Sequence, residues 1–268
     1  MPAVSAAAAV VSPPARPYHD DPSITAFYRD LVEPFGETVD EALLRGGANV
    51  FHRDLADALV DDEGIGELVA DLVIVTHALP DVHPFTAVAS HLNMRLGGRA
   101  TSFAISEQGL AAPFTALRVM SGFQRSGRAE CAVLAVLEQT TMPTRHPLVH
   151  DNELVDSGAL LVFGGADGLR VDAVETTPTA DAATERLREL AAKDPDDTLL
   201  VVGPWSAWDG LDGSAVHRVA PGGYCTSVWL ELARNWRNWQ QEHAVVVLAD
   251  VEPRTGQGHL AVLRSGRQ

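Results

Sequence analysis

The chain has 268 residues, of which 46% are hydrophobic and 21% are charged, which is enough to bury the core of one large domain or of two small fused ones. Its formal net charge of −16 argues against a nucleic acid partner, because binding to phosphate groups needs a basic face. The two cysteines, Cys131 and Cys225, provide neither a disulfide framework nor the spacing of a zinc site, and we expect no cofactor.

The N-terminal stretch, residues 1–18, contains a run of small apolar residues followed by Ser12-Pro13-Pro14. No basic residue precedes the apolar run, so the stretch differs from a signal peptide and predicts a strand that ends in a proline turn. No apolar run approaches the roughly 20 residues that are needed to cross a bilayer. We therefore expect a cytoplasmic protein that does not enter a membrane.

Short apolar runs rich in Val, Leu and Ala follow along the chain, and continuous runs of this kind are typical of central strands covered on both faces. They occupy residues 71–78, 101–106, 130–138, 158–165, 198–205, 214–220, 243–251 and 258–264. Helices are predicted between some of these runs, at Pro84–Leu96, Leu110–Gly122 and Thr226–Gln241. The order of the elements indicates a mixed α/β fold.

One segment, FAISEQGLAAPF, predicts an elbow between a buried strand and a helix. The strand ends at Ser106, and the chain then turns sharply through Glu107, Gln108 and Gly109. Such an elbow is where α/β enzymes often carry a nucleophile, because the turn lifts one side chain out of the sheet. This elbow contains no Cys, and its only hydroxyl belongs to Ser106, which has no base beside it in the sequence.

The predicted elements occur twice. Thirty residues separate Phe103 in the elbow strand from Val133 in the next strand, and thirty residues also separate Val216 from Val246 in the second half. Each half then ends in two strands joined by a short turn, GGADG in the first and EPRTGQG in the second. An internal duplication of a βαββ unit is the simplest explanation.

Several of these segments resemble the thiolase-fold β-ketoacyl synthases, and in particular the ketoacyl synthase III branch. The similarity lies in the order and spacing of the units, and it covers most of residues 1–172 and about 198–264. The segments that carry it are AVSAAAAVVSPP, HPFTAVASHLNMRLG, RLGGRATSFAISEQGLAAPFTALRVMSGFQRSGRAECAVLAVLEQTT, LVFGGADGLRV and PGGYCTSVWLELA.

The resemblance implies a thiolase-like αβαβα sandwich of two related halves. The N-terminal half would be residues 1–172, and residues 173–268 would form a shortened C-terminal half, because the segment between Thr176 and Thr198 is too short for the family's lid-forming insertion. The resemblance also implies a dimer in which the strand Phe103–Ser106 continues the sheet across a twofold axis. The dimer would contain two copies of this chain, or one copy and a catalytic ketosynthase.

Members of the family use a Cys nucleophile at the elbow, and a His and an Asn from the second half. All three positions differ in this sequence. The Cys position falls on Gly109 or Leu110, the His position on Trp205 or Ser206, and the Asn position on Gly223 or Tyr224. The three catalytic positions are lost together, while the glycine turns and the buried strands remain. The resemblance therefore predicts a protein that keeps the fold of the family but does not condense acyl groups.

The leading hypothesis is therefore a non-condensing ketosynthase-like protein of a polyketide-like or fatty-acid-like specialised pathway. It would act as a chain-length-factor-like subunit, or bind an acyl carrier protein or acyl-CoA. Its substrate-binding residues would be Ser106, Glu107, Gln108, Gly109, His77, His83, Trp205 and Tyr224.

Several side chains keep alternatives open. Glu107 is either a cap at a helix start or a general base. Cys225, at the second elbow, is either a small buried residue or an alternative nucleophile, and His217 either pairs with it or is a hydrogen-bonded core residue. The competing hypothesis is thus an acyltransferase or thioester hydrolase that uses Cys225, His217 or Glu107. A loop with two histidines, His146–Glu153, lacks the pattern of a metal site.

Overall fold

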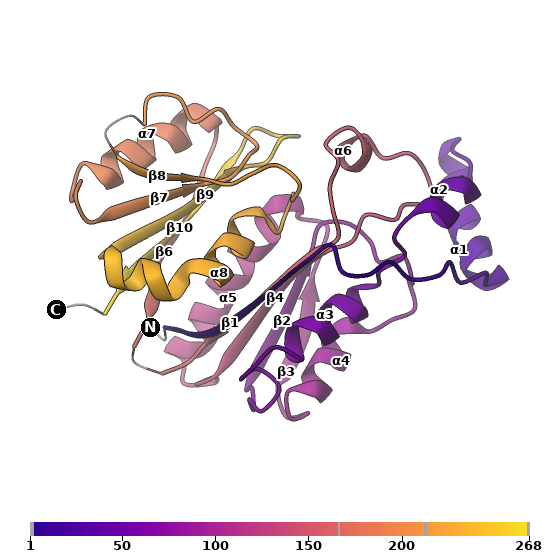
Figure 1. The fold of residues 1–268 in the computed structure, drawn as a ribbon, viewed down its shortest axis with the longest axis horizontal. Coiled ribbons are helices and arrows are strands. Elements are labelled where there is room, and N and C mark those ends of the chain that lie inside the picture. The colour runs from indigo at the N-terminus through magenta and orange to yellow at the C-terminus, as the bar shows by residue number, and fades with distance from the viewer. Residues whose placement is uncertain (1–2, 166, 212–213, 267–268) are drawn as a thin grey trace.

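Two five-stranded sheets with the same strand order form the framework of the protein (Figure 1). The computed structural model describes residues 3–165, 167–211 and 214–266. The first sheet has the order β1-β5-β4-β2-β3 and the second the order β6-β10-β9-β7-β8. In each sheet one strand, β5 in the first and β10 in the second, runs antiparallel to both of its neighbours, and the remaining pairs are parallel. The matching topologies confirm the internal duplication that the spacing predicts.

The strands of the first sheet are β1 (Val4–Val11), β2 (Leu72–His77), β3 (Thr101–Ile105), β4 (Ala132–Glu138) and β5 (Ser157–Phe163). Those of the second are β6 (Leu169–Thr177), β7 (Thr198–Val202), β8 (Ala215–Arg218), β9 (Val245–Val251) and β10 (Gly258–Ser265). Strand β6 pairs with β10 and spans the expected boundary at residue 172. The chain therefore enters the second sheet before that residue.

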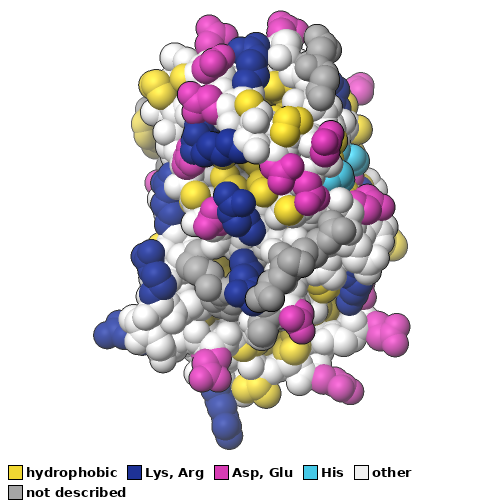
Figure 2. Space-filling view, turned by 90° about the vertical axis from the view of Figure 1, so that its left-hand side faces the viewer, with side chains coloured by type: hydrophobic (Ala, Val, Ile, Leu, Met, Phe, Trp, Pro, Cys, Tyr) yellow, Lys and Arg dark blue, Asp and Glu magenta, His cyan; other side chains and the backbone are white. Residues whose placement is uncertain are grey.

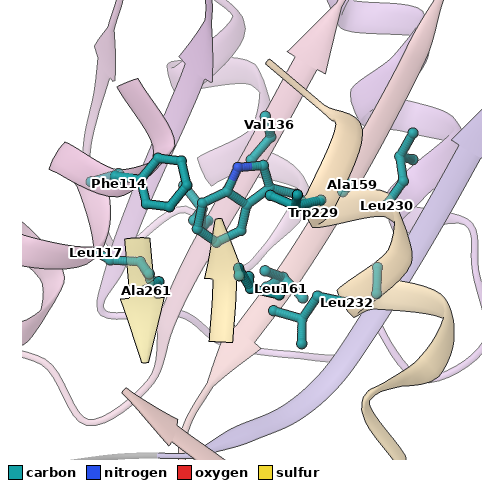
Figure 3. Packing of buried hydrophobic residues seen from close by; sticks show 14 of the residues in the cluster. Phe114, Leu117, Val136, Ala159, Leu161, Trp229, Leu230, Leu232 and Ala261 are labelled. Atoms are coloured by element: carbon teal, nitrogen blue, oxygen red, sulfur yellow. The ribbon is translucent and has the colours of Figure 1, made fainter. Parts of the chain in front are cut away.

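Two long helices, α5 (Ala112–Arg125) and α8 (Ser227–Glu242), lie between the sheets and contact both of them. Figure 3 shows the packing in this middle layer, where the rings of Phe114 and Trp229 meet edge to face with their centroids 4.9 Å apart. Trp229, Leu232 and Trp236 are buried there, and their spacing puts them on one side of α8. The apolar side chains of both helices and both sheets thus form one continuous core.

The outer layers differ between the halves. The first sheet is covered by α3 (His52–Val60) and α4 (Val88–Arg95), whereas α7 (Ala180–Ala191) covers the second (Figure 1). Where α4 connects β2 to β3, a loop connects β7 to β8. Trp208 of this loop is buried against the second sheet together with Leu211, and its indole N–H donates to the Gly203 carbonyl at 2.7 Å. A large side chain thus covers apolar surface that a helix covers in the first half.

Three short helices lie outside the two sheets: α1 (Pro22–Val32), α2 (Glu41–Gly46) and α6 (Pro147–His150). A 3-10 turn, η1 (Glu33–Phe35), continues α1, and another, η2 (Gly109–Ala111), precedes α5. Ile24 and Tyr28 on α1 pack against Leu44 on α2 in a small separate core. The Tyr28 hydroxyl donates to the Val82 carbonyl at 2.5 Å and so joins α1 to the first half.

The elbow strand is less buried than the sequence predicts. We expected the strand at Phe103 to be buried, but β3 lies at the edge of the first sheet and pairs with β2 alone. Ala104 is exposed, and Phe103 and Ile105 are half-buried. The apolar run is short because only one of its faces packs on the core.

Candidate functional site

The first elbow joins β3 to α5 through an exposed turn. Glu107 has a left-handed backbone with φ of 62°, and its side chain, like those of Ser106 and Gln108, is exposed. The Gln108 side-chain oxygen accepts a hydrogen bond from the Thr115 hydroxyl at 2.7 Å, on the first turn of the helix. The side chains of the turn therefore lie on the surface, whereas the chain becomes buried at Gly109 and Leu110.

The backbone at Gly109 and Leu110 meets a carboxylate from the other half of the chain. Glu252, which follows β9, accepts a hydrogen bond from the Leu110 N–H at 3.1 Å. Gly109 has φ of 53°, and a Cβ atom at this position would overlap the side chains of Glu252, Tyr224 and Arg254. The elbow therefore has no room for a side chain at Gly109, which is one of the two positions, with Leu110, on which the family's Cys falls.

Three side chains fill this space, and we name Tyr224, Glu252 and Arg254 the elbow cluster. The Tyr224 hydroxyl donates to one Glu252 oxygen, Oε2. The Arg254 Nε donates to the other, Oε1, at 2.8 Å, and its Nη2 donates to the Tyr224 oxygen at 3.2 Å. Tyr224 and Glu252 are almost fully buried, and Arg254 lies above them at the surface. The cluster is closed by its own hydrogen bonds.

Glu252 is held in its charged form. Burial raises the pKa of its carboxyl, but the hydrogen bonds from Arg254, Tyr224 and the Leu110 backbone together lower it by more, so its pKa lies below the usual value. The pKa of Tyr224 is raised, first by burial and then by the adjacent carboxylate, which keeps the phenol protonated. A negative charge beside the elbow amides opposes the oxyanion that forms during attack on a thioester.

The second elbow leads into α8 and is closed in a related way. The buried Glu138, at the end of β4, accepts hydrogen bonds from the backbone N–H groups of Tyr224 at 2.8 Å and Cys225 at 2.7 Å. The Cys225 sulfhydryl donates to the Leu137 carbonyl at 3.6 Å. Burial, and then the neighbouring Glu138, raise the pKa of Cys225 well above the ordinary value of a thiol. The surroundings of Cys225 thus disfavour the thiolate that nucleophilic attack needs.

Trp205 separates the elbow cluster from a surface cavity. Its ring meets Tyr224 edge to face at 5.5 Å between centroids, and its indole N–H donates to the Gly223 carbonyl at 3.2 Å. The cavity has a volume of about 340 Å³. It is lined by His150, Asp151, Asn152, Glu153, Leu154, Pro204, Trp205, Pro221 and Gly222. The structure thus brings Trp205 and Tyr224 together with Gly109 from the opposite half.

The other histidines considered in the sequence lie elsewhere. His217, on the edge strand β8, has its Nε2 2.8 Å from Glu231 and its ring centroid 5.4 Å from that of Trp239. The Cys225 thiol instead donates a hydrogen bond to the Leu137 carbonyl of β4, so each of these two side chains has a different partner. His77 is the last residue of β2 and packs on the buried His52, with ring centroids 4.7 Å apart. Burial lowers the pKa of both imidazoles.

His83 lies in the loop after β2, where its Nδ1 is 3.2 Å from the Thr86 hydroxyl and its ring packs against that of Phe51. Neither His77 nor His83 is among the residues that line the Trp205 cavity. Within the described residues, no group of three or more His, Cys, Asp or Glu side chains is arranged to hold a metal ion. The same part of the chain contains no helix that is both long and apolar enough to span a membrane.

Sequence reasoning missed the two glutamates and Arg254. Each glutamate ends a run that already predicts a strand, as VLE at Glu138 and as DVEP at Glu252, but a carboxylate in that position is ordinarily exposed. The internal duplication could have pointed to the two glutamates, because the apolar runs before them occupy corresponding places in the two halves.

Comparison with solved structures identifies the architecture. A structure described as AbyA1, a tetronic acid condensing enzyme, matches 99% of this chain and 100% of its own, with a TM-score of 0.63 and 16% identity. The 3-oxoacyl-(acyl-carrier-protein) synthase III of Aquifex aeolicus matches 98% and 100%, with a TM-score of 0.65 and 12% identity. This chain has the thiolase-like fold of the ketoacyl synthase III enzymes.

The same fold extends to a variant of OleA from Xanthomonas campestris, which covers 98% of both chains with a TM-score of 0.63 and 13% identity. Neither a protein-family model nor a curated protein matches the sequence. The similarity confirms the fold that the resemblance implies, over almost the whole chain. At this level of identity it says nothing of the chemistry, which has to be argued from the site.

Proposed function

We propose that this protein is a ketosynthase-like subunit that does not condense acyl groups. The observation that carries the proposal is the contact between Gly109 and the elbow cluster. A condensing enzyme of this fold needs an attacking atom at the elbow and donors aimed at the developing oxyanion. Here the glycine has no attacking atom, a charged carboxylate accepts the hydrogen bond of the Leu110 amide, and the space is filled.

The role that fits such an elbow is that of a chain-length-factor-like subunit, which shapes a pocket while another subunit makes the bond. A dimer through the exposed edge of β3 would place two such chains, or this chain and a catalytic ketosynthase, side by side. The half-buried Phe103 and Ile105 and the exposed Ala104 support this, because an edge strand with apolar side chains readily pairs with another strand.

The partner molecule would be an acyl carrier protein or acyl-CoA of a polyketide-like or fatty-acid-like specialised pathway. The names of two similar structures, a tetronic acid condensing enzyme and a 3-oxoacyl-(acyl-carrier-protein) synthase III, support this choice of partner. The 340 Å³ cavity falls within the size range of small-molecule pockets, and it is lined by Trp205, whose ring contacts Tyr224 of the elbow cluster.

The competing hypothesis, acyl transfer or thioester hydrolysis by unusual residues, has less support. Cys225 is buried and its pKa is raised, and His217 is paired with Glu231. Glu107 is exposed on the turn, and the cluster that fills the elbow is built from other residues. A catalytic unit requires the nucleophile and base within hydrogen-bond reach of each other, whereas here each has a different partner.

A reconstituted condensation assay tests the proposal. The purified chain is incubated with an acyl-CoA and a malonyl-carrier protein, alone and with the ketosynthase encoded nearest to its gene. We expect no β-ketoacyl product from the chain alone, and a change in the length of the product when the ketosynthase is present. Product formed by the chain alone would contradict the proposal, and an unchanged product in the mixture would contradict the partner role.

A further inference from the structure

Helix α1 has two apolar sides, and only one of them is covered. Ile24 and Tyr28 point inward and pack on Leu44. Phe27 and Leu31 lie four residues apart, so they lie one above the other on a different side of the helix, and both are exposed. A helix that needs only one apolar side to join its domain therefore presents a second one to the surroundings.

Two further large exposed side chains lie next to this helix, one in the chain that follows it and one in contact with Phe27. Phe35 ends the 3-10 turn that continues α1, and Phe85 in the loop after β2 meets Phe27 with ring centroids 5.6 Å apart. The exposed fractions are 37% for Phe27, 48% for Leu31, 83% for Phe35 and 59% for Phe85. We name these four residues the apolar ridge. Four of the seven exposed large hydrophobic residues in the described part of the chain belong to it, and gathered apolar side chains mark interaction sites.

The surroundings of the apolar ridge are acidic. Asp30, Glu33 and Glu37 are exposed along the same stretch of chain. The nearby arginines are already neutralised within the protein, since Arg29 lies 3.6 Å from Glu41 and Arg45 lies between Asp20 and Glu41 at 3.4 and 3.5 Å. The end of the molecule opposite α1 differs, because acidic and basic side chains are interspersed there (Figure 2).

We propose that the apolar ridge is the docking surface for a partner protein whose apolar side chains are flanked by Lys or Arg. The charge selects among the possible occupants. A second copy of this chain would bring Asp30, Glu33 and Glu37 close to the same residues of the first in a twofold contact, and like charges oppose that contact. An anionic lipid surface is repelled for the same reason. A basic, amphipathic segment satisfies both the apolar and the charged parts of the surface.

Two helical peptides with the same pattern of leucines provide the probe. In one peptide the leucines are flanked by lysine and arginine, and in the other by glutamate. Binding to the full chain is followed by fluorescence anisotropy of the labelled peptide. We expect the basic peptide to bind at least about tenfold more tightly at low salt, and the difference to shrink when the ionic strength is raised to about 0.5 M, where exposed charges are screened.

Variants locate the binding surface. Leu31→Ser and Phe35→Ser should each lower the affinity for the basic peptide several-fold. The combination Asp30→Lys with Glu33→Lys should make the chain bind the acidic peptide more tightly than the basic one. Met94→Ser is the matched control, because Met94 is 66% exposed on α4 and lies outside the apolar ridge. All of these positions are exposed, so the variants are expected to fold, which circular dichroism checks.

Three outcomes would overturn the proposal. The first is equal binding of the two peptides, or no binding of the basic one. The second is an equal effect of Met94→Ser and Phe35→Ser. The third is a self-associated chain, in sedimentation experiments, that Phe35→Ser converts to a smaller species, since a second copy would then be the occupant. None of these readouts depends on whether the elbow condenses acyl groups.

Discussion

Glu138 ends β4 and Glu252 directly follows β9, the middle strands of their respective sheets, and each binds the elbow of the opposite half. Glu138 accepts the N–H groups of Tyr224 and Cys225 at the start of α8, and Glu252 accepts the Leu110 N–H at the start of α5. The duplication thus produces two crossed interactions, each between a buried carboxylate and a helix start. In each case the carboxylate satisfies buried backbone N–H groups of the turn that precedes the helix.

The first prediction concerns the Glu252 carboxylate. Glu252→Gln should lower the free energy of unfolding at pH 7 by about 1–3 kcal/mol, because the hydrogen bonds to a charged, buried acceptor are weakened. Urea denaturation measures this, with the exposed Glu67→Gln as a control that should change little. The pKa of Glu252 is lowered in the folded protein, so its contribution is complete above the ordinary pKa of 4.5 and is lost as the pH falls through the folded value. A variant as stable as the parent at pH 7 would contradict this.

For Asp250 we predict the opposite pH dependence of the protein's stability. It is fully buried, accepts a hydrogen bond from the Ser227 hydroxyl at 2.7 Å, and burial raises its pKa from 3.8 to about 7. The folded protein therefore binds an extra proton between these values, and stability falls as the pH rises through this window, by up to about 1.4 kcal/mol per pH unit.

Asp250→Asn removes this titration. Its stability relative to the parent should therefore increase between pH 5 and pH 8, because the parent must hold a buried charge at the higher pH. Thermal unfolding at the two pH values is the measurement. The control is Asp62→Asn at an exposed site, which should show no trend. A relative stability of Asp250→Asn that stays constant or decreases from pH 5 to pH 8 would contradict the burial of a titrating carboxyl.

Two glycines of the same region should respond in opposite directions to alanine. Gly109→Ala should destabilise the protein by about 1–3 kcal/mol, because the residue has a positive φ and its Cβ would overlap the elbow cluster. Gly122→Ala on α5 should stabilise it by about 1 kcal/mol, because no atom lies within 4 Å of the new methyl group and alanine favours a helix. Equal effects would mean that the elbow has more room than the structure indicates.

Cysteine labelling tests the second elbow. Iodoacetamide should modify the half-buried Cys131 of the native protein faster than Cys225, because the Cys225 thiol is buried and its pKa is raised further from neutrality. In denaturant both should react. Rapid native modification of Cys225 that an acyl thioester blocks would instead favour the acyltransferase hypothesis.

The exposed edge of the first sheet predicts the oligomeric state. Light scattering should give twice the 28.6 kDa mass of the chain for two copies, or 28.6 kDa plus the mass of the partner in the presence of a ketosynthase. Ala104→Asp on β3 should shift the mass toward that of one chain, because a buried, unpaired charge at a strand junction is unfavourable. Ala215→Asp on β8, the corresponding edge strand of the second half, is the control. A monomeric parent under both conditions would contradict the dimer.

Much of the architecture could be predicted because the signals are local and repeated. The apolar runs, the turn at Glu107 and the equal spacing of Phe103–Val133 and Val216–Val246 are visible in short windows, and the paired sheets confirm them. The strand after the turn GGADG was expected in the first half, but β6 belongs to the second sheet. It forms no continuous apolar run, because its apolar residues alternate with Arg170 and Asp172, as in an edge strand of a sheet.

The elbow cluster could not be predicted from local patterns. Glu252 is 142 residues from Leu110 along the chain, and only the packing of the two halves brings them together. The resemblance to the family places Tyr224 near the site, but it does not indicate that the Tyr224 hydroxyl donates a hydrogen bond to Glu252. A carboxylate after a strand carries no mark of burial in the sequence, because its donors come from elsewhere in the fold.

Mass spectrometry of the intact protein tests the central claim most directly, namely that the first elbow forms no covalent acyl-enzyme. The chain is incubated with acyl-CoA, and separately with acyl-carrier protein, and its mass is then compared with that of the untreated protein. The elbow cluster and the absence of an attacking atom at Gly109 predict an unchanged mass. Gly109→Cys should not restore condensation, because the His and Asn positions of the family are lost as well. A stoichiometric acyl adduct on Ser106 would contradict the claim, and an adduct on Cys225 would move the chemistry to the second elbow.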